Sequence, residues 1–442
     1  MAEKVEFYRE TEFKDTEIGR IPKEWEVAQL GSENVSIFIK SGSTPLKKVK
    51  EYWNGNIPFV TQSDMTKVDR YLYETSEKIT DLGLKNSNLL LIPEDSVLLS
   101  MYGTIGKVVI NKTPVAISQN IAAIILNKKN VNHEYLFYVV QKYSFQLKRR
   151  AKIITLKHLD IQIIKNMLLP FPSLQEQQKI AEILSTVDEA IQKTDDIIAK
   201  TERLKKGLMQ ELFTKGIGHN EFKDTEIGRI PKEWEVKKIR EIGELSRGLS
   251  YRGQEKFAEE VTGGYLFLTL NSIKEGGGLK EDGWSWIRTD RLRERHFVRE
   301  GDIVIANTDI GMQRGHILGA PALIYFPSWY RKDRAVYSMD LSKLQLKSNL
   351  HHKFLFYYLS YVQPIARKYH TGTNVWHLNL DAWSNELSIP LPPLHEQQKI
   401  AEILSTVDKK LEILKQEKVK LERIKQWFME ELLTGRIRVR VA

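Results

Sequence analysis

Two stretches of the chain repeat apolar or small residues at alternating steps of four and three positions. The first runs from residue 180 to residue 208 and the second from residue 400 to residue 428. This spacing places the apolar positions on one narrow stripe of an α-helix, as in the seam of a coiled coil. Prolines lie just before both stretches and none lies inside them, which is typical of helix starts. The pattern predicts two helices of about 40 residues, each about 60 Å long.

The predicted seams consist mainly of aliphatic side chains. Leu204 continues the first seam beyond Thr201, and Lys418 interrupts the second seam at one layer. A single amphipathic helix packed on a globular core is the alternative, but a stripe this narrow favours pairing of the two stretches. The seam positions that we expect to pack are Ile180, Leu184, Val187, Ile191, Ile198, Ile400, Leu404, Val407, Leu411 and Leu414.

Both stretches belong to an internal duplication. The segment EFKDTEIGRIPKEWEV at 12–27 recurs unchanged at 221–236, and EQQKIAEILSTVD at 176–188 recurs unchanged at 396–408. The blocks between these repeats have diverged, with only faint similarity between GTIGKVVI at 103–110 and DIGMQRGHI at 309–317. Each block alternates short strand-like runs with turn signals and one helical stretch, which predicts mixed α and β structure. One repeated frame therefore carries two different globular blocks.

The connectivity predicts how the two long helices run. Only residues 215–236 separate the end of the first helix from the second block, so the second block should lie where the first helix ends. The second helix must then run back beside the first. We expect a mixed α/β (α+β) fold in which two globular domains are joined and separated by two long helices. These helices form an antiparallel coiled coil, with a pseudo-two-fold internal duplication. The expected boundaries are 1–170, 171–215, 216–392 and 393–442.

Composition narrows the class of protein. The chain contains no cysteine, which excludes a disulfide framework, a thiolate nucleophile and cysteine-ligated zinc. The first residues lack the apolar run of a signal peptide, and nowhere do about 18 apolar residues follow one another as a membrane span requires. We therefore expect a cytoplasmic protein without a membrane partner.

Positive charge is concentrated in the two blocks. Residues 28–170 carry 19 basic and 11 acidic side chains, a net charge of +8, and residues 237–392 carry 22 basic and 17 acidic side chains, a net charge of +5. The whole chain has a net charge of +10, so the rest of the chain is slightly acidic. Such fields favour polyanionic partners, although a basic soluble protein without such a partner remains the alternative. Arginine suits phosphate and guanine edges, and polar neighbours can read base edges. The candidate DNA-contacting residues are Lys47, Lys48, Lys50, Gln62, Ser63, Lys148, Arg149, Arg150, Lys152, Arg252, Asn271, Arg288, Arg291, Arg293, Gln313, Arg314, Arg331, Lys332, Arg334, Asn374 and His377.

Motifs of enzyme chemistry do not occur in the sequence. Gly106 and Lys107 are followed by valine rather than the Ser or Thr of a phosphate-binding loop, and HEQQK at 395–399 lacks the second histidine of a zinc-protease helix. Histidines are scattered rather than grouped with other ligand types. We expect neither a catalytic site nor a metal site in this chain.

The repeated motifs resemble those of a known family. GRIPKEWEV at 19–27 and 228–236, with PSLQEQQKIAEIL at 172–184 and PPLHEQQKIAEIL at 392–404, resemble the specificity subunit of Type I restriction-modification systems, often called HsdS. The resemblance covers nearly the whole chain. It implies that each block is a target recognition domain for one half of a bipartite DNA site. It also implies that the paired helices set the spacing between half-sites and dock methyltransferase subunits.

The resemblance also implies the partners. They are double-stranded DNA and two modification subunits, which use S-adenosylmethionine to methylate adenine. Where restriction subunits are present, these motor-nuclease subunits use ATP and Mg²⁺. This chain itself would bind no cofactor and would be a non-catalytic subunit of the complex. Two other interpretations stay open on the residues alone: a protein-interaction scaffold with two basic binding domains, and a self-sufficient nuclease or methylase with a degenerate site.

Overall fold

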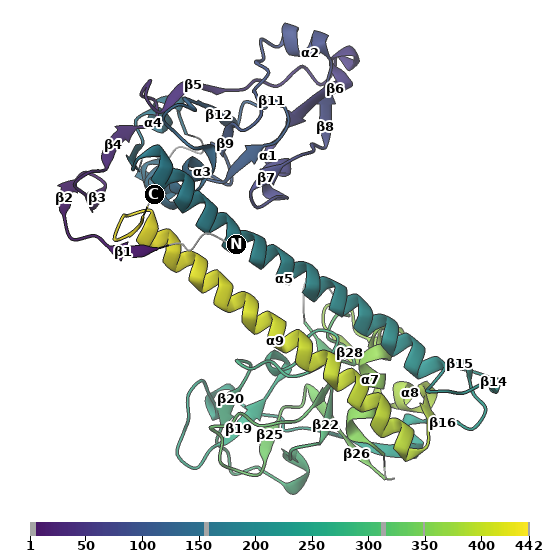
Figure 1. Cartoon of the computed structure of the whole chain (residues 1–442). Helices are drawn as coiled ribbons and strands as arrows, with labels where there is room; N and C mark the ends of the chain where they lie inside the picture. The colour runs from purple at the N-terminus through teal and green to yellow at the C-terminus, as the bar shows by residue number, and fades with distance from the viewer. Residues whose placement is uncertain (1–5, 154–158, 311–314, 348–349, 441–442) are drawn as a thin grey trace. The chain divides into compact units, whose positions relative to one another are not determined.

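The computed structural model describes residues 6–153, 159–310, 315–347 and 350–440, without the side chains of residues 148–153 (Figure 1). The chain divides into two compact units, Met1–Asp195 with Gln416–Ala442 and Asp196–Lys415. Helix α5 (Leu174–Thr214) and helix α9 (Leu394–Leu432) are the two long helices, and each contributes one half to each unit. The predicted mixed α/β fold with two long helices is confirmed.

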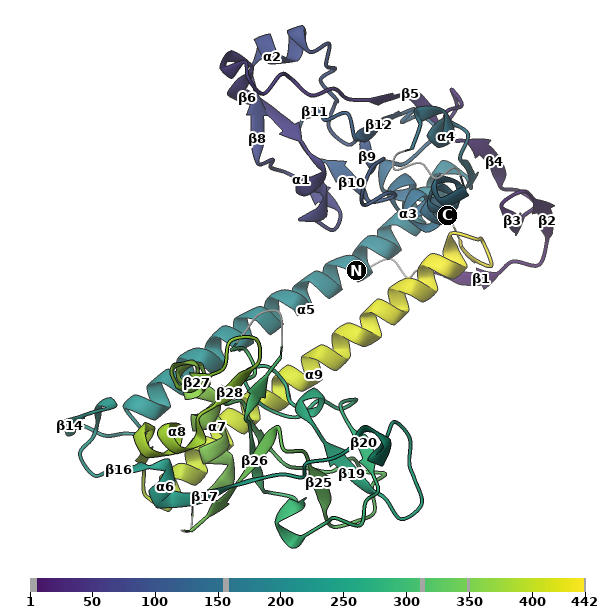
Figure 2. The ribbon, with the colours of Figure 1, turned by 180° about the vertical axis from the view of Figure 1, so that it is seen from behind.

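The first unit is built on a five-stranded sheet in the order β5-β12-β9-β10-β7. All neighbours are antiparallel except β10 and β7. A smaller sheet, β11-β6-β8, lies further from α5 in the same unit (Figure 2). The strands are β5 Ser36–Ser41, β6 Trp53–Val60, β7 Tyr71–Leu72, β8 Glu77–Ile79, β9 Val97–Ser100, β10 Val108–Asn111, β11 Ala116–Ile117 and β12 Ile121–Leu126, and the helices are η1 Lys50–Tyr52, α1 Gln62–Thr66, α2 Asp81–Asn86, α3 His133–Ile153 and α4 Ile161–Lys165.

The second unit repeats the central part of this design. Its sheet β17-β26-β22-β24 has the same antiparallel order as β5-β12-β9-β10. Two further sheets, β18-β20-β19-β25-β21 and β23-β28-β27, belong to this unit. The strands are β17 Gly243–Arg247, β18 Lys256–Phe257, β19 Tyr265–Leu268, β20 Ser285–Ile287, β21 Phe297–Val298, β22 Ile303–Ala306, β23 Thr308–Asp309, β24 Pro321–Leu323, β25 Ala335–Tyr337, β26 Leu341–Leu346, β27 His370–Thr371 and β28 Trp376–Leu378. The helices are α6 Ile239–Ile242, η2 Gly253–Glu255, η3 Leu270–Ser272, η4 Glu294–His296, α7 His352–Val362, η5 Gln363–Tyr369 and α8 Leu380–Glu386.

Helices α3 and α7 join each block to the long helices. In α3, Tyr135 through Val140 are all buried, so this half of the helix is apolar on every side. Such a helix must be covered on more than one face. The core around α3 includes sheet residues together with Ile180 and Leu184 of α5 and Leu432 of α9. The core around α7 likewise includes Phe213 of α5 with Ile400 and Leu404 of α9.

The first repeated segment forms the same structure in both units. Strands β2 (Phe13–Thr16) and β3 (Gly19–Pro22) make a hairpin, and β14 (Phe222–Thr225) and β15 (Gly228–Pro231) make its copy. The turn requires a positive φ at Gly19 (107°) and at Gly228 (105°), which glycine adopts without strain. Strand β4 (Glu26–Gln29) then pairs with β13 (Leu168–Phe171), and β16 (Glu235–Lys238) pairs with β29 (Ser388–Leu391). Of the prolines that precede the long helices, Pro170 lies in β13 and Pro390 lies in β29.

The halves of α5 and α9 run antiparallel in each unit. In the first unit Asp188 pairs with Lys425 (2.7 Å) and Asp195 with Lys418 (2.6 Å). In the second unit Lys205 pairs with Asp408 (2.6 Å). As the residue number rises along α5, the number of the partner on α9 falls. The predicted antiparallel pairing is confirmed, and Lys418 fits its layer because Asp195 neutralises its charge.

Most predicted seam positions are shielded from solvent. Ile180, Leu184, Ile400, Leu404, Leu411 and Leu414 are buried, and Val187, Ile191, Ile198 and Val407 are partly buried. The expectation for Leu204 is wrong, because this side chain is 56% exposed. Lys205 is turned inward instead, since its ammonium pairs with Asp408 and lies 5.4 Å from the ring centre of Tyr357.

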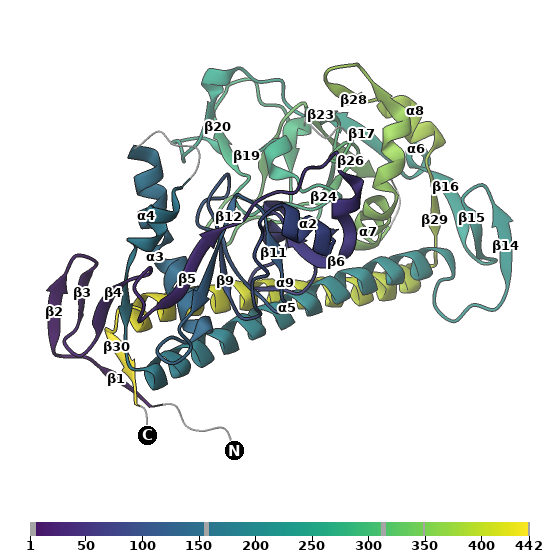
Figure 3. The same ribbon diagram turned by 90° about the horizontal axis from the view of Figure 1, so that it is seen from above.

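The end of α9 returns to the beginning of the chain. Strand β30 (Ile437–Val439) pairs with β1 (Phe7–Arg9) in an antiparallel ladder, which Figure 3 shows near both termini. Both strands belong to the first unit. This ladder ties residues 437–439, which follow α9, to residues 7–9.

Candidate nucleic-acid interface

A buried glutamate at the start of each long helix joins the two repeated segments. Glu176 of α5 is 2% exposed and accepts a hydrogen bond from the indole Nε1 of Trp25 (3.3 Å). Glu396 of α9 is 4% exposed and accepts the same bond from Trp234 (3.0 Å). The adjacent Gln177 accepts from the backbone N–H of Asn132, just before α3. Each repeat therefore fixes the hairpin and the block to its helix.

The side chains that bind the carboxylate oxygens of these two glutamates differ between the units. Arg438 of β30 donates to both oxygens of Glu176 (2.9 Å each) and also binds Glu10 (2.7 Å). Hydrogen bonding to Glu176 raises the pKa of Arg438 above its ordinary value. In the second unit the Nε2 atom of His219 lies 2.9 and 3.0 Å from the two oxygens of Glu396. The repeated glutamate thus binds a different residue in each unit, Arg438 in the first and His219 in the second.

A second joint, identical in both units, links the block helix to the helix pair. Tyr138 of α3 donates to Asp188 (2.6 Å), which also binds Lys425. Tyr357 of α7 donates to Asp408 (2.8 Å), which also binds Lys205. Burial raises the pKa of both tyrosines, so each hydroxyl stays protonated and donates. Asp188 and Asp408 are the last residues of the second repeat, which explains why the identity extends to them.

The candidate residues of the first block do not form one surface. Lys47 pairs with Glu77 and lies 4.7 Å from the ring centre of Trp53. The amide of Gln62 donates to Thr104 Oγ1 (3.0 Å) and to the carbonyl of Tyr102, so it is engaged inside the block. The candidates Lys47, Lys48, Lys50 and Ser63 are exposed. Four candidates lie on α3 with side chains outside the described part of the chain: Lys148, Arg149, Arg150 and Lys152.

Several basic candidates of the second block are held by internal contacts. Arg291 pairs with Glu255 through Nε at 3.2 Å, and Arg334 pairs with Glu294 (3.0 Å). The backbone N–H of Arg252 and then the Arg291 guanidinium lower the pKa of Glu255 to about 2, so this pair persists at neutral pH. Arg288 and Lys332 lie over the rings of Phe257 and Tyr265, respectively. Arg252, Asn271, Arg293, Arg331, Asn374 and His377 are exposed, and Gln313 and Arg314 lie outside the described residues.

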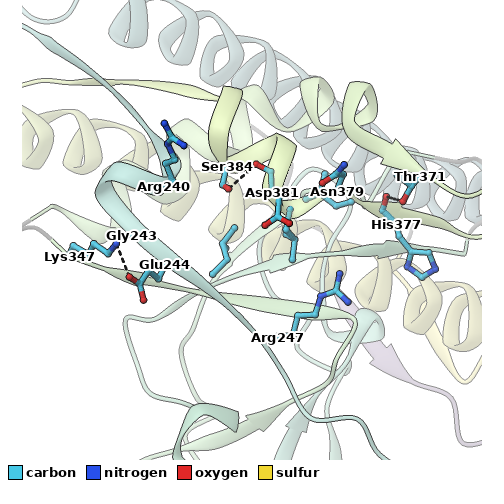
Figure 4. Close-up of a pocket in the computed structure, with 13 residues that line it drawn as sticks. Arg240, Gly243, Glu244, Arg247, Lys347, Thr371, His377, Asn379, Asp381 and Ser384 are labelled. Atoms are coloured by element: carbon cyan, nitrogen blue, oxygen red, sulfur yellow. Dashed lines mark hydrogen bonds and ion pairs between the residues drawn. The ribbon is translucent and has the colours of Figure 1, made fainter.

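A polar cleft in the second unit contains residues that the sequence did not single out. Its volume is about 660 Å³, and it is lined by β17, the β27–β28 hairpin and α8 (Figure 4). Of the predicted residues only His377 lines it. The charged or amide residues that sequence reasoning missed are Arg240, Glu244, Arg247, Lys347, Asn379 and Asp381. Nothing in the sequence indicates that residues 240–247 meet residues 371–384.

The described residues contain neither a helix that could span a membrane nor a group of metal ligands. No helix of the described chain has the length and apolar character needed to cross a membrane. Within the same residues, no three His, Cys, Asp or Glu side chains are grouped as metal ligands.

Comparison with known proteins gives consistent matches along the chain. The profile of the family described as the Type I restriction modification DNA specificity domain matches twice, over residues 22–203 and 231–423. The MjaVIII specificity subunit of a Type I restriction enzyme from Methanocaldococcus jannaschii is 30% identical over 99% of this chain and 98% of its own length. The Escherichia coli EcoR124I/EcoR124II specificity subunit is 30% identical over 33% of this chain and 37% of its own.

Solved structures share the fold. A chain from a study of complex assembly and conformational transition in the type I R-M system aligns with a TM-score of 0.58 at 17% identity, covering 94% of this chain and 99% of that one. The S subunit of the Type I restriction-modification system of M. genitalium aligns with a TM-score of 0.52 at 14% identity, covering 92% and 96%.

The Glu176 joint predicts a difference between the salt bridge of Arg438 on β30 and that of Arg440, which follows β30. Replacing Glu176 with alanine leaves Arg438 buried without its main partner, which should cost about 3–5 kcal/mol of unfolding free energy. The matched control is Glu6→Ala, which removes the partner of Arg440. Both side chains of that pair are more than 60% exposed, so the loss should stay below about 1 kcal/mol. Denaturant unfolding of the three chains measures both values, and equal losses would contradict the assigned role of Glu176.

Proposed function

The chain belongs to the family of Type I restriction-modification specificity subunits, and on this premise we propose that each globular block reads one half of a bipartite DNA site. The paired helices hold the two readers and dock the methyltransferase subunits. The observation that carries the proposal is the combination of constant joints with diverged blocks. The Trp–Glu and Tyr–Asp–Lys contacts recur in both units, whereas the block sequences share little.

The chemistry of modification is assigned to the partners. In this proposal the modification subunits bind S-adenosylmethionine and methylate adenine, and restriction subunits, where present, use ATP and Mg²⁺. This chain binds the DNA and contributes no catalytic step. Phosphate contacts from both blocks position the protein, and polar side chains read base edges. The target adenine must leave the base stack to be methylated, and the partner extrudes it.

Independent reading by the two blocks is testable by exchange. Replacing residues 28–170 with the corresponding block of another specificity subunit should change one half of the methylated motif and leave the other half intact. The exchange leaves Trp25, Glu176 and Asp188 in place, and the incoming block must supply a tyrosine at the place of Tyr138, which lies inside the exchanged segment. Methylation-sensitive sequencing of DNA from cells expressing the chimaera with a modification subunit reports both halves. A change in both halves would contradict the proposal, and so would the absence of any bipartite motif with the native chain.

The spacing between half-sites should follow the length of the helix pair. Inserting four residues into both helices, after Ala190 and after Lys410, lengthens each by about 6 Å. At about 34–36 Å per helical turn of DNA, the unread gap should grow by about two base pairs. The methylated motif of the assembled enzyme measures the gap. An unchanged gap would show that the helices do not set the spacing.

The outer surface of the helix pair offers two equivalent apolar positions for docking. Leu204 of α5 is 56% exposed and Ile424 of α9 is 44% exposed, and the two are separated by the 220-residue offset of the second repeat. Burial of such an aliphatic side chain in the surface of a partner is favourable. We assign one methyltransferase subunit to each position.

Charge substitution tests this assignment. Leu204→Glu and Ile424→Glu should each remove one of two bound modification subunits, and the double variant should remove both, because a buried carboxylate without a partner is costly. Native mass spectrometry of the purified complexes counts the subunits. The control is Ile37→Glu, an equally apolar residue on β5 that is 70% exposed and should leave two subunits bound. Loss of subunits only with the control would overturn the assignment.

A further inference from the structure

The cleft between β17, α8 and the β27–β28 hairpin contains a cation and an anion without partners. Arg247 ends β17 and Asp381 lies in the first turn of α8, and both are exposed. In the described part of the chain, neither the Arg247 guanidinium nor the Asp381 carboxylate makes a hydrogen bond or an ion pair. We propose that this cleft is a base-reading site, in which Arg247 and Asp381 together recognise a G·C pair in the half-site bound by the second block. This inference rests on the proposed function.

The other charged residues of the cleft are already paired. Lys347 binds Glu244 (2.8 Å), and Arg240 donates to Asn385 (2.8 Å). Figure 4 shows Arg247 and Asp381 on different walls of the cleft, with β17 below and α8 above. Within the arginine clusters that the sequence indicated, Arg291 and Arg334 are bound to glutamates of their own block. Arg247 is therefore available to a ligand without the loss of an internal ion pair.

The walls of the cleft are built to hold their side chains in place. Strand β28 pairs with β23 on one side and β27 on the other. The hairpin turn requires glycine at position 372, where φ is +89°. A Cβ atom at this position would lie only 2.3 Å from the carbonyl oxygen of Val375. Outside the turn, the His370 ring stacks on Trp376 with ring centres 4.0 Å apart. A reading site gains specificity from such fixed supports.

The chemistry of the pair matches one base pair. In the major groove guanine presents two acceptors, N7 and O6, which a planar arginine fork fits, and cytosine presents one donor, the N4 amino group, which a carboxylate accepts. Arg247 and Asp381 supply a fork and an acceptor from facing elements. A phosphate ligand would be attracted by Arg247 but repelled by Asp381, so the combination favours a base edge over the backbone.

The duplicated sheet gives an independent comparison. Arg247 pairs with Ser342 on β26, and in the first unit Ser41 pairs with Ala122 at the same place of the β5–β12 ladder. Asp381 is the second residue of α8, and Gln162 is the second residue of α4. The charged pair of the second unit is thus a neutral Ser and Gln in the first. Residues needed for folding of the shared sheet would not be expected to change charge in this way, whereas residues that read different bases would.

The test uses the full chain assembled with its modification subunits, and the methylated motif is determined by sequencing. Arg247→Ala should reduce the preference for G·C at one position of the second half-site by about tenfold to a hundredfold. Arg247→Lys keeps the charge without the fork, so it should lose the same preference while retaining overall methylation. The first half-site reports in the same molecules that the protein is folded. The matched control, Arg229→Ala, removes an exposed arginine of β15 outside the second block and should leave the motif unchanged.

Two results would overturn the inference without affecting the proposed function. One is a native second half-site without a G·C pair. The other is an Arg247→Ala chain that methylates an unchanged motif, whether at the native level or at a uniformly lower one, as loss of a phosphate contact would give. If the native complex methylates no bipartite motif, the proposed function itself fails.

Discussion

The buried carboxylate at the start of each long helix is the interaction on which the rest of the structure depends. A carboxylate removed from water must be matched by hydrogen bonds or an opposite charge. Glu176 meets this need with Trp25 and Arg438, and Glu396 with Trp234 and His219. These partners come from segments more than 150 residues away in the chain. Pairing each carboxylate therefore brings residues that are distant in the sequence to the start of a long helix.

The two kinds of joint divide the chain into a constant part and a variable part. The Tyr–Asp–Lys contacts connect each block helix to both long helices, and their aspartates mark the end of the repeated sequence. Beyond these joints the sheet order is kept while side chains at equivalent places change, as with Ser41 and Arg247. A frame that carries all the supporting contacts leaves the blocks free to diverge in what they bind.

The surface chemistry shows why clusters of basic residues in a sequence are weak guides to a binding site. Arg291 and Arg334 lie in two separate clusters of basic residues, yet their guanidinium groups are bound to Glu255 and Glu294. Arg247 is isolated in the sequence but stands in a polar cleft. Local charge density counts cations, whereas binding depends on which of them lack an internal partner, and that is a property of long-range contacts.

The sequence by itself determined the long helices, the duplication, the mixed α/β blocks and the antiparallel direction of α5 and α9. Helix periodicity is a local signal, exact repeats are visible in any single sequence, and chain connectivity leaves only one direction for the second helix. Only the tertiary structure decided that Lys205 rather than Leu204 turns inward, because Asp408 and Tyr357 lie opposite it. It alone brought β17 beside the β27–β28 hairpin. Contacts between such distant residues follow from packing of the whole unit, which no local pattern encodes.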